Sequence, residues 1–208
     1  MKKKILLSIA ELLSLTVLML SVPIIIGIDS LVIGHGTSET SITELMQEAL
    51  ILLSAVLCGI SAWKRPQSRG FLALAAGFFG CMFIRECDAF FDKIAHGFWV
   101  YPAITFALAT TLYALTSRET VIPTLLAYLG KSHFTYISIG LLLILVFSRA
   151  FGSGHLWEGV MGANYRSAYK SMIQEGLELL GYVHVAYGAV LLFFYEKMST
   201  GKEQATES

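Results

Sequence analysis

The sequence predicts an all-α, polytopic membrane protein that forms a bundle of six transmembrane helices. Three observations predict it: 55% of the 208 residues are hydrophobic, 14% are charged, and the mean hydropathy is +0.67. An average soluble domain carries about 25% charged residues, so this chain cannot cover itself with an ordinary polar surface. The composition also excludes a disordered chain, and the balance of 15 basic against 15 acidic residues excludes a basic nucleic-acid binder.

Six apolar stretches are long enough to cross a bilayer core, which needs roughly 20 residues per helix. They comprise residues 5–28, 45–63, 70–88, 99–115, 134–151 and 175–195. The first is longer than the apolar part of a signal peptide, and no small-residue cleavage site follows it, so we interpret it as a retained span. We expect residues 1–198 to form one transmembrane domain and residues 199–208 to form a polar cytoplasmic tail.

The basic residues predict the orientation of the bundle. With the N-terminus in the cytoplasm, the inner segments contain Lys2, Lys3, Lys4, Lys64, Arg65, Arg69, Arg118, Lys131, Lys197 and Lys202. The outer segments contain Arg85, Lys93, Arg149, Arg166 and Lys170. This excess of inner basic residues favours cytoplasmic N- and C-termini. Most acids fall on the outer side, and Ser41-Ile-Thr-Glu44 predicts a capping box at the start of the second helix.

Several ionisable residues are predicted at or below the outer ends of the spans, where charge is costly. These candidates for a polar centre are Glu48, Arg85, Glu86, Asp88, Arg149, Glu175, Glu178 and His184. His184 lies deepest, toward the midplane. We expect these groups either to pair with one another and set the helix register, or to form a functional polar centre.

Helical spacing predicts which of these side chains face other helices. Glu48 shares a face with Ala55, Gly59 and Ala62. In the third span a stripe of small residues leads to Asp88; its members are Ala73, Ala76, Gly77, Gly80 and Cys81. In the sixth span Glu178 and His184 share an arc with Gln174 and two glycines. Because small residues mark helix contacts in membranes, we expect Glu48, Asp88, Glu178 and His184 to face the bundle interior.

A divalent metal is one alternative occupant of this centre, because carboxylates and imidazoles from facing helices can bind iron, manganese or zinc. The candidate ligands are Glu48, Asp88, Asp92, His96, Glu175, Glu178 and His184. The chain has no Glu-x-x-His motif, and Asp92 with His96 is more typical of an interfacial ion pair. Haem is disfavoured because no second deep histidine is predicted, and nucleotide binding because no P-loop or Rossmann fingerprint occurs.

Three functions remain open, all integral to a membrane that we expect to be the bacterial inner membrane. The leading hypothesis is a small accessory or scaffold subunit, which predicts closed ion pairs and an exposed groove of small residues. A proton- or cation-coupled transporter predicts a water-filled cavity at Glu178 and His184. A metal-dependent enzyme acting on a lipid or hydrophobic substrate predicts three or more candidate ligands around one point. The expected partners are the lipid bilayer and, for the first hypothesis, other membrane subunits or a second copy of the chain.

Overall fold

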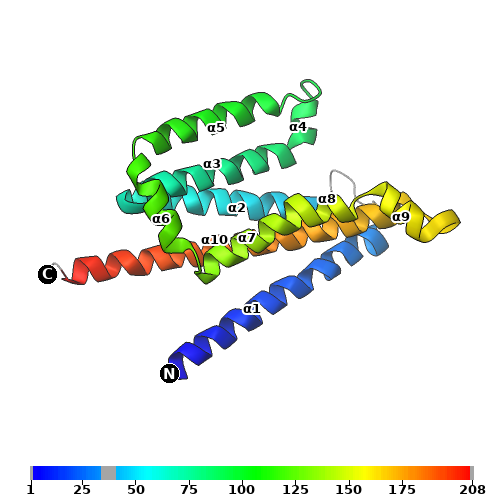
Figure 1. Cartoon of the computed structure of the whole chain (residues 1–208). Coiled ribbons are helices and arrows are strands. Elements are labelled where there is room, and N and C mark those ends of the chain that lie inside the picture. Colours follow the sequence, from blue (N-terminus) through cyan, green and yellow to red (C-terminus); the bar gives the residue numbers. More distant parts are fainter. Residues whose placement is uncertain (1, 34–40, 207–208) are drawn as a thin grey trace. The chain divides into compact units, whose positions relative to one another are not determined.

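A computed structural model of the chain describes residues 2–33 and 41–206 (Figure 1). This described part is predominantly helical and contains no strand, which confirms the predicted all-α class. The chain divides into two compact units. The first comprises Met1–Gln47 and Gly140–Val183, and the second comprises Glu48–Ile139 and His184–Ser208.

The first unit begins with α1 (Lys2–Gly27), which continues into the π-helical turn η1 (Ile28–Ile33). The next described element is α2 (Ile42–Lys64), whose first turn belongs to this unit. Ser41 Oγ accepts a hydrogen bond from the Glu44 backbone N–H at 3.1 Å, which is one of the two hydrogen bonds of the predicted capping box. The predicted outer loop before it includes residues 34–40, which lie outside the described part.

The rest of the first unit is a helical arm that turns back on itself. It consists of the end of α7 (Ser132–Leu142), η4 (Leu143–Phe147), α8 (Ser148–Phe151), α9 (Gly154–Met161), η5 (Gly162–Asn164) and the start of α10 (Ser167–Thr206). Gly181 of α10 brings two helices close together, because a Cβ there would lie 2.5 Å from Ile144 Cγ1 and 2.8 Å from the Gly140 carbonyl. This is the close approach that a glycine in a membrane helix allows.

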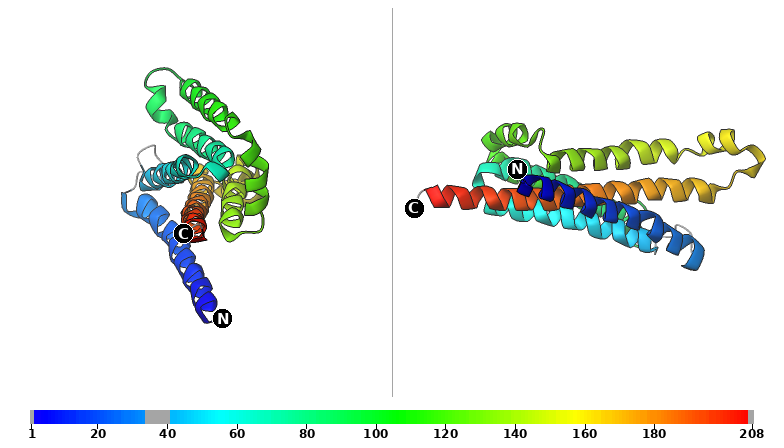
Figure 2. Two further views of the ribbon diagram at one scale, coloured as in Figure 1. Left: turned by 90° about the vertical axis from the view of Figure 1, so that its left-hand side faces the viewer. Right: turned by 90° about the horizontal axis from the view of Figure 1, so that it is seen from below.

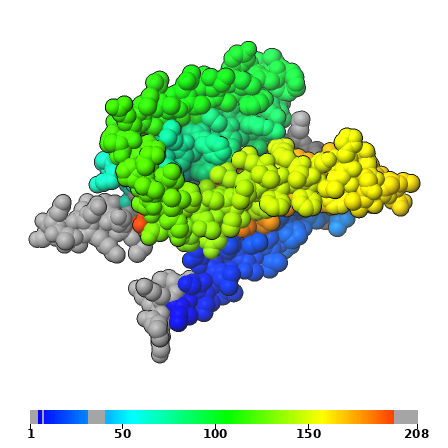
Figure 3. Space-filling model, viewed as in Figure 1, coloured from blue at the N-terminus to red at the C-terminus, as the bar shows by residue number. Residues whose placement is uncertain are grey.

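The second unit contains most of α2, η2 (Pro66–Ser68), α3 (Arg69–Glu86), α4 (Asp88–Asp92), α5 (Val100–Leu115), η3 (Arg118–Thr120) and α6 (Val121–Tyr128). Its main contact is the packing of α5 along α3, which Figure 3 shows as atoms of the two helices lying directly against each other. The predicted small-residue stripe of α3 makes this contact, because a Cβ at Gly77 would overlap Thr110 and one at Gly80 would overlap Phe106.

Five helical segments are long and apolar enough to cross a membrane. They are Ser8–Leu31, Ile42–Lys64, Pro66–Glu86, Ser132–Phe151 and Ser167–Tyr195. The predicted span 99–115 is different: α5 has 16 residues, and it meets the segment Arg118–Tyr128 at an angle of 86°. At 1.5 Å per residue, α5 alone covers about 24 Å, less than the bilayer core. The predicted span 99–115 is therefore long enough to cross only together with the bent segment that follows it, and the described helices provide five or six candidate crossings.

The span of α10 is the most buried of the five: 61% of the residues in its most apolar stretch are buried, against 11% for α1. Its helix continues past the predicted span in both directions, beginning at Ser167 and ending at Thr206 (Figure 2). Most of the predicted tail 199–208 is thus a continuation of this helix, and residues 207–208 lie outside the described part. The exposed apolar side chains of α1 suit a helix that contacts lipid.

Candidate functional site

The ten candidate site residues divide between the two units. Arg149, Glu175 and Glu178 belong to the first unit. The second unit contains Glu48, Arg85, Glu86, Asp88, Asp92, His96 and His184. The candidates therefore form two sets of side chains, one in each unit.

Glu178 is the most buried carboxylate of the first set, with 8% of its surface exposed. Gln174, one turn earlier on α10, donates a hydrogen bond from Nε2 to Glu178 Oε1 at 3.3 Å. The guanidinium of Arg149 on α8 lies 3.5 Å from the same oxygen. The side chain of Arg149 is 52% exposed and that of Glu178 is 11% exposed, so the ion pair joins a buried carboxylate to a half-exposed cation. The pair links α8 to α10.

Two neighbours hold Arg149 and Gln174 in place. Ser148 is fully buried and donates to the Ile144 carbonyl at 2.5 Å, which fixes the turn that carries Arg149. Gly152, at the end of α8, lies so close to Gln174 that any Cβ would overlap the amide oxygen. The same glycine also approaches the Ser148 carbonyl, so the absence of a side chain at residue 152 allows Gln174 to reach Glu178.

Glu175 is tied to the start of α2 through its backbone. Gln47, which is 4% exposed, donates from Nε2 to the Glu175 carbonyl at 3.2 Å. Glu175 also has a further interaction partner. Gln47 was not predicted as a site residue, because a neutral amide in an apolar stretch carries no charge. Its position one residue before Glu48 was the available signal that it belongs to the same polar layer.

Asp29 is a second buried carboxylate of the first unit that the sequence analysis did not select, with 3% of its surface exposed. Its oxygens accept hydrogen bonds from the backbone N–H of Ile42 at 3.0 Å and of Thr43 at 2.7 Å. The Thr43 hydroxyl also donates to it. The carboxylate thus satisfies donors at the first turn of α2, where the helix dipole favours negative charge.

In the second unit the charges at the end of α3 pair with one another. The Nη1 atom of Arg85 lies 3.6 Å from Oε1 of Glu86 and 4.0 Å from Oδ2 of Asp88. Glu86 has the least exposed side chain of the three, at 14%. At the junction of α3 and α4, one cation thus lies beside two carboxylates, at distances typical of weak ion pairs.

Asp92, the last residue of α4, and His96, in the loop that follows it, form a local motif. Asp92 accepts a hydrogen bond from the Gly97 backbone N–H and lies close to His96 Nδ1, both at 2.8 Å. The Gly97 hydrogen bond first, and then the one with His96, lower the pKa of Asp92. Gly97 has a φ of 77°, the left-handed conformation that favours glycine, so this residue allows the turn.

The remaining two candidates lie on the central helices of the second unit. Glu48 of α2 is half-buried, and His184 of α10 is 6% exposed and has an interaction partner. Across residues 2–33 and 41–206, no three His, Cys, Asp or Glu side chains are arranged to hold a metal ion. The geometry therefore gives no support to the metal hypothesis.

His133 is a buried histidine that was not among the predicted site residues. It lies in the first turn of α7 and is 3% exposed, with its ring 4.9 Å from that of Tyr128 and 5.0 Å from that of Tyr195. Its Nε2 atom has no hydrogen-bond partner in the described part of the chain. Aromatic residues at both neighbouring helix ends were the only available signal for this cluster, and they are also typical of a membrane interface.

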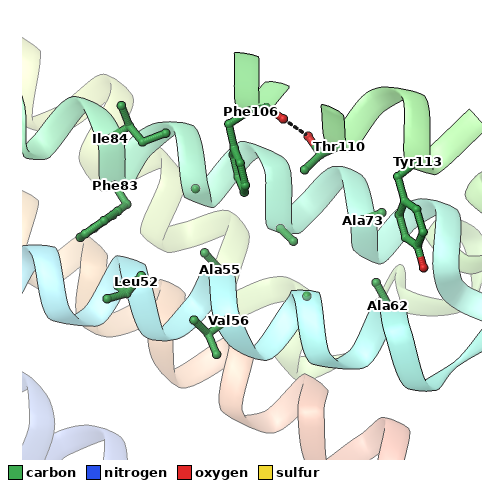
Figure 4. A pocket seen from close by; sticks show the side chains of 13 residues that line it. Leu52, Ala55, Val56, Ala62, Ala73, Phe83, Ile84, Phe106, Thr110 and Tyr113 are labelled. Carbon is green, nitrogen blue, oxygen red and sulfur yellow. Dashed lines mark hydrogen bonds between the residues drawn. The ribbon is translucent and has the colours of Figure 1, made fainter. Parts of the chain in front are cut away.

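The second unit also contains an apolar groove with a cavity volume of about 430 Å³, bounded by α2, α3 and α5 (Figure 4). Ala55, Gly59 and Ala62 of α2 face Ala73, Ala76 and Gly80 of α3 across it. The other lining residues come from all three helices: Leu52, Val56, Phe83, Ile84, Phe106, Thr110 and Tyr113. None of the polar-centre candidates lines this groove, although Gly59 and Ala76 were predicted as parts of contact faces.

A smaller apolar hollow of about 360 Å³ lies on the first unit between α9 and α10. Its lining consists of Trp157, Met161, Tyr169, Met172 and Ile173. Neither this hollow nor the groove is lined by Glu178 or His184, the residues at which the transporter hypothesis predicts a water-filled cavity.

The chain matches none of the protein-family models, curated proteins or solved structures with which it was compared. Its functional class therefore depends on its own chemistry. The helices and their apolar lengths identify an integral membrane protein in contact with lipid.

Proposed function

We propose that the protein is a small accessory or scaffold subunit of a membrane system, in which the charges at the ends of the helices fix their register. The observation that carries this proposal is the closure of Glu178, which receives a hydrogen bond from Gln174 and an ion pair from Arg149. A carboxylate that relays protons or binds a cation needs access to water or to its ligand. A carboxylate engaged by Gln174 of its own helix and by Arg149 of α8 instead stabilises one packing of α10 against α8.

The proposed setting is the bacterial inner membrane, with both termini in the cytoplasm. The excess of lysine and arginine in the predicted inner segments supports this orientation. It requires six crossings, so the broken pair formed by α5 and the segment Arg118–Tyr128 acts as one of them. Cysteine labelling of residues in η2 and α9 from either side of intact inner-membrane vesicles tests the orientation, because the two elements should react from opposite sides.

Flux measurements test the structural role of Glu178. The purified protein is reconstituted in liposomes that contain a pH-sensitive dye, and a potential is imposed across the membrane. We expect the wild type and Glu178→Gln to give the same flux as protein-free liposomes. A proton flux in the wild type that Glu178→Gln abolishes, while Glu158→Gln at an exposed position retains it, would show that the carboxylate has a transport role and contradict the proposal.

The accessory role itself is tested by the size of the particle extracted from native membranes. Mild detergent followed by native electrophoresis and mass measurement should give a complex of fixed composition, larger than the 22.8 kDa chain with its micelle. A particle that contains one copy of the chain and no other protein, in every mild detergent used, would contradict an accessory or scaffold role.

A further inference from the structure

The groove between α2, α3 and α5 combines an apolar cavity with a basic end. We propose that it binds one acyl chain of an anionic phospholipid, with the lipid phosphate held by Lys64, Arg69 and Arg118. The groove, its basic end and all the contacts used below belong to the second unit.

The groove exists because two facing positions lack side chains that could fill it. A Cβ added at Gly59 would meet only the Ala76 Cβ, at 4.0 Å. The neighbouring glycines of α3 are different, since Thr110 and Phe106 of α5 already occupy the space beside Gly77 and Gly80. Packing by α5 thus fills part of the small-residue stripe and leaves the part that faces Gly59 open.

The length of the groove suits an extended hydrocarbon chain. Along α2 it extends from Leu52 to Ala62, which is about 15 Å at 1.5 Å per residue. The cavity volume of about 430 Å³ lies along this length, so the groove is elongated along the helix axis, as an acyl chain in a membrane is.

The lining residues offer an occupant almost no hydrogen-bonding groups. No charged side chain lines the groove, and the hydroxyl of Thr110 donates to the carbonyls of Phe106 and Ala107 on its own helix. Tyr113 contributes its phenol at the end where Ala62 and Ala73 lie (Figure 4). A polar solute would lose its hydration here without replacement hydrogen bonds, whereas a hydrocarbon would not.

Basic residues gather at that same end. Arg69 donates from Nε to the Ala62 carbonyl at 3.4 Å, which places its guanidinium group beside a residue of the groove. The start of α3 is held against η3, because the Gly70 N–H donates to Thr120 Oγ1 at 2.9 Å. Arg118 of η3 therefore lies near Arg69. Residues 64–69 and 117–120 contain four basic residues and one acid, Glu119, so this end carries a net positive charge.

Two of these cations are available to a ligand. Lys64 and Arg118 are exposed, and neither makes an ion pair within the described residues. Basic residues beside a gap between membrane helices recognise anionic lipid headgroups, with the phosphate at the interface and the chain below it. The apolar groove thus adjoins a positively charged end, as the acyl chain of a phospholipid adjoins its phosphate.

Native mass spectrometry of the protein from nanodiscs tests the acyl-chain contact. The nanodiscs contain equal amounts of phosphatidylglycerol and phosphatidylcholine, and the retained lipids are counted. We expect one retained phosphatidylglycerol on the wild type and at least a tenfold loss in Gly59→Leu, whose side chain fills the groove. Gly27→Leu is the matched control, because residue 27 of α1 also has open space around it, and it should retain the lipid. Val56→Trp offers a second way to fill the groove from an exposed position.

The headgroup contact is tested by neutralising its cations. The double variant Lys64→Gln, Arg118→Gln should lower the preference for phosphatidylglycerol over phosphatidylcholine at least tenfold, since each cation near the surface contributes measurably to anionic-lipid binding. Lys93→Gln, in the loop between α4 and α5, should leave the preference unchanged.

Three outcomes would overturn the proposal. The first is the same lipid retention in the wild type and in both groove-filling variants. The second is equal retention of the two lipids by the wild type. The third is a photo-cross-linker at Val56 that captures another protein rather than lipid in native membranes, which would make the groove a docking site for a partner.

Discussion

The two glycines at positions 77 and 59 belong to facing stripes of small residues, yet they have different surroundings. Gly77 of α3 is closed by Thr110 of α5, whereas a Cβ added at Gly59 of α2 would meet only Ala76, at 4.0 Å. Small residues therefore permit close packing but do not ensure it, because the side chains of another helix, here α5, must occupy the space beside them. Where it does, the stripe stabilises the fold, and where it does not, the stripe leaves a binding groove.

The same contrast holds between the polar end of the first unit and the groove of the second. Glu178 and Asp29 are buried carboxylates whose oxygens are engaged by neighbouring donors. An apolar cavity needs no hydrogen-bond partners, because an empty apolar space loses dispersion contacts but leaves no polar group unsatisfied. The buried carboxylates therefore have partners, whereas the unfilled space is lined by apolar groups.

The largest expected effect comes from filling the closed position. Gly77→Leu should lower the free energy of unfolding by about 3 kcal/mol, because the new side chain overlaps Thr110 and forces α5 away from α3. Unfolding in mixed micelles of increasing SDS content measures this change. Gly59→Ala should be neutral or slightly stabilising, since its Cβ has room and alanine is the better helix former. Equal losses in the two variants would remove the distinction between closed and open stripes.

The next effect concerns the buried cap. Asp29→Ala should lower the free energy of unfolding by about 2 kcal/mol, because two backbone donors at the start of α2 lose their acceptor. The same SDS titration measures it, with the exposed Glu158→Ala as the matched control. A loss no greater than that of the control would show that the first turn of α2 does not depend on this carboxylate.

The smallest effect is the pH dependence of the exposed Asp92 motif. The pKa of Asp92 is lowered, so its contribution to stability is present above the ordinary carboxyl range and is lost as the pH falls through the lowered value. The thermal midpoint of the wild type should therefore decline on acidification slightly more than that of Asp92→Asn. His96→Gln should keep most of this dependence, because the Gly97 hydrogen bond is the larger cause. An identical pH profile for the wild type and Asp92→Asn would contradict this assignment.

Hydropathy predicted the membrane class and the five long spans because burying backbone in lipid demands long apolar helices. The cap at Ser41 and the packing role of Gly77 and Gly80 were also predicted, since both follow from local spacing. The end of α5 at Leu115 matches the predicted span, but the helical segment Arg118–Tyr128, bent by 86° from α5, was not predicted. The residues that follow α5, Thr116 and Ser117, carry no proline or glycine signal, although the Thr116 hydroxyl bonds back to the Tyr113 carbonyl and competes with helix continuation.

The polar contacts were only partly predictable. The sequence identified Glu178 and Arg149 as members of one layer, but their pairing joins residues on separate helices and depends on the path of the chain between them. Gln47 and Asp29 depend on tertiary contacts in the same way, with partners 128 and 14 residues away. The groove needed the position of α5, which the pattern of small residues does not specify.

The contact between Arg149 and Glu178 tests the central claim, that the buried charge is closed for structural reasons. A double-mutant cycle with Arg149→Gln, Glu178→Gln and the combined variant measures their coupling in the free energy of unfolding. We predict that the double variant loses less stability than the two single variants together, with a coupling of about 1 kcal/mol, a modest value because Arg149 is half exposed. Strictly additive losses would show that the two groups do not stabilise each other and would contradict the account.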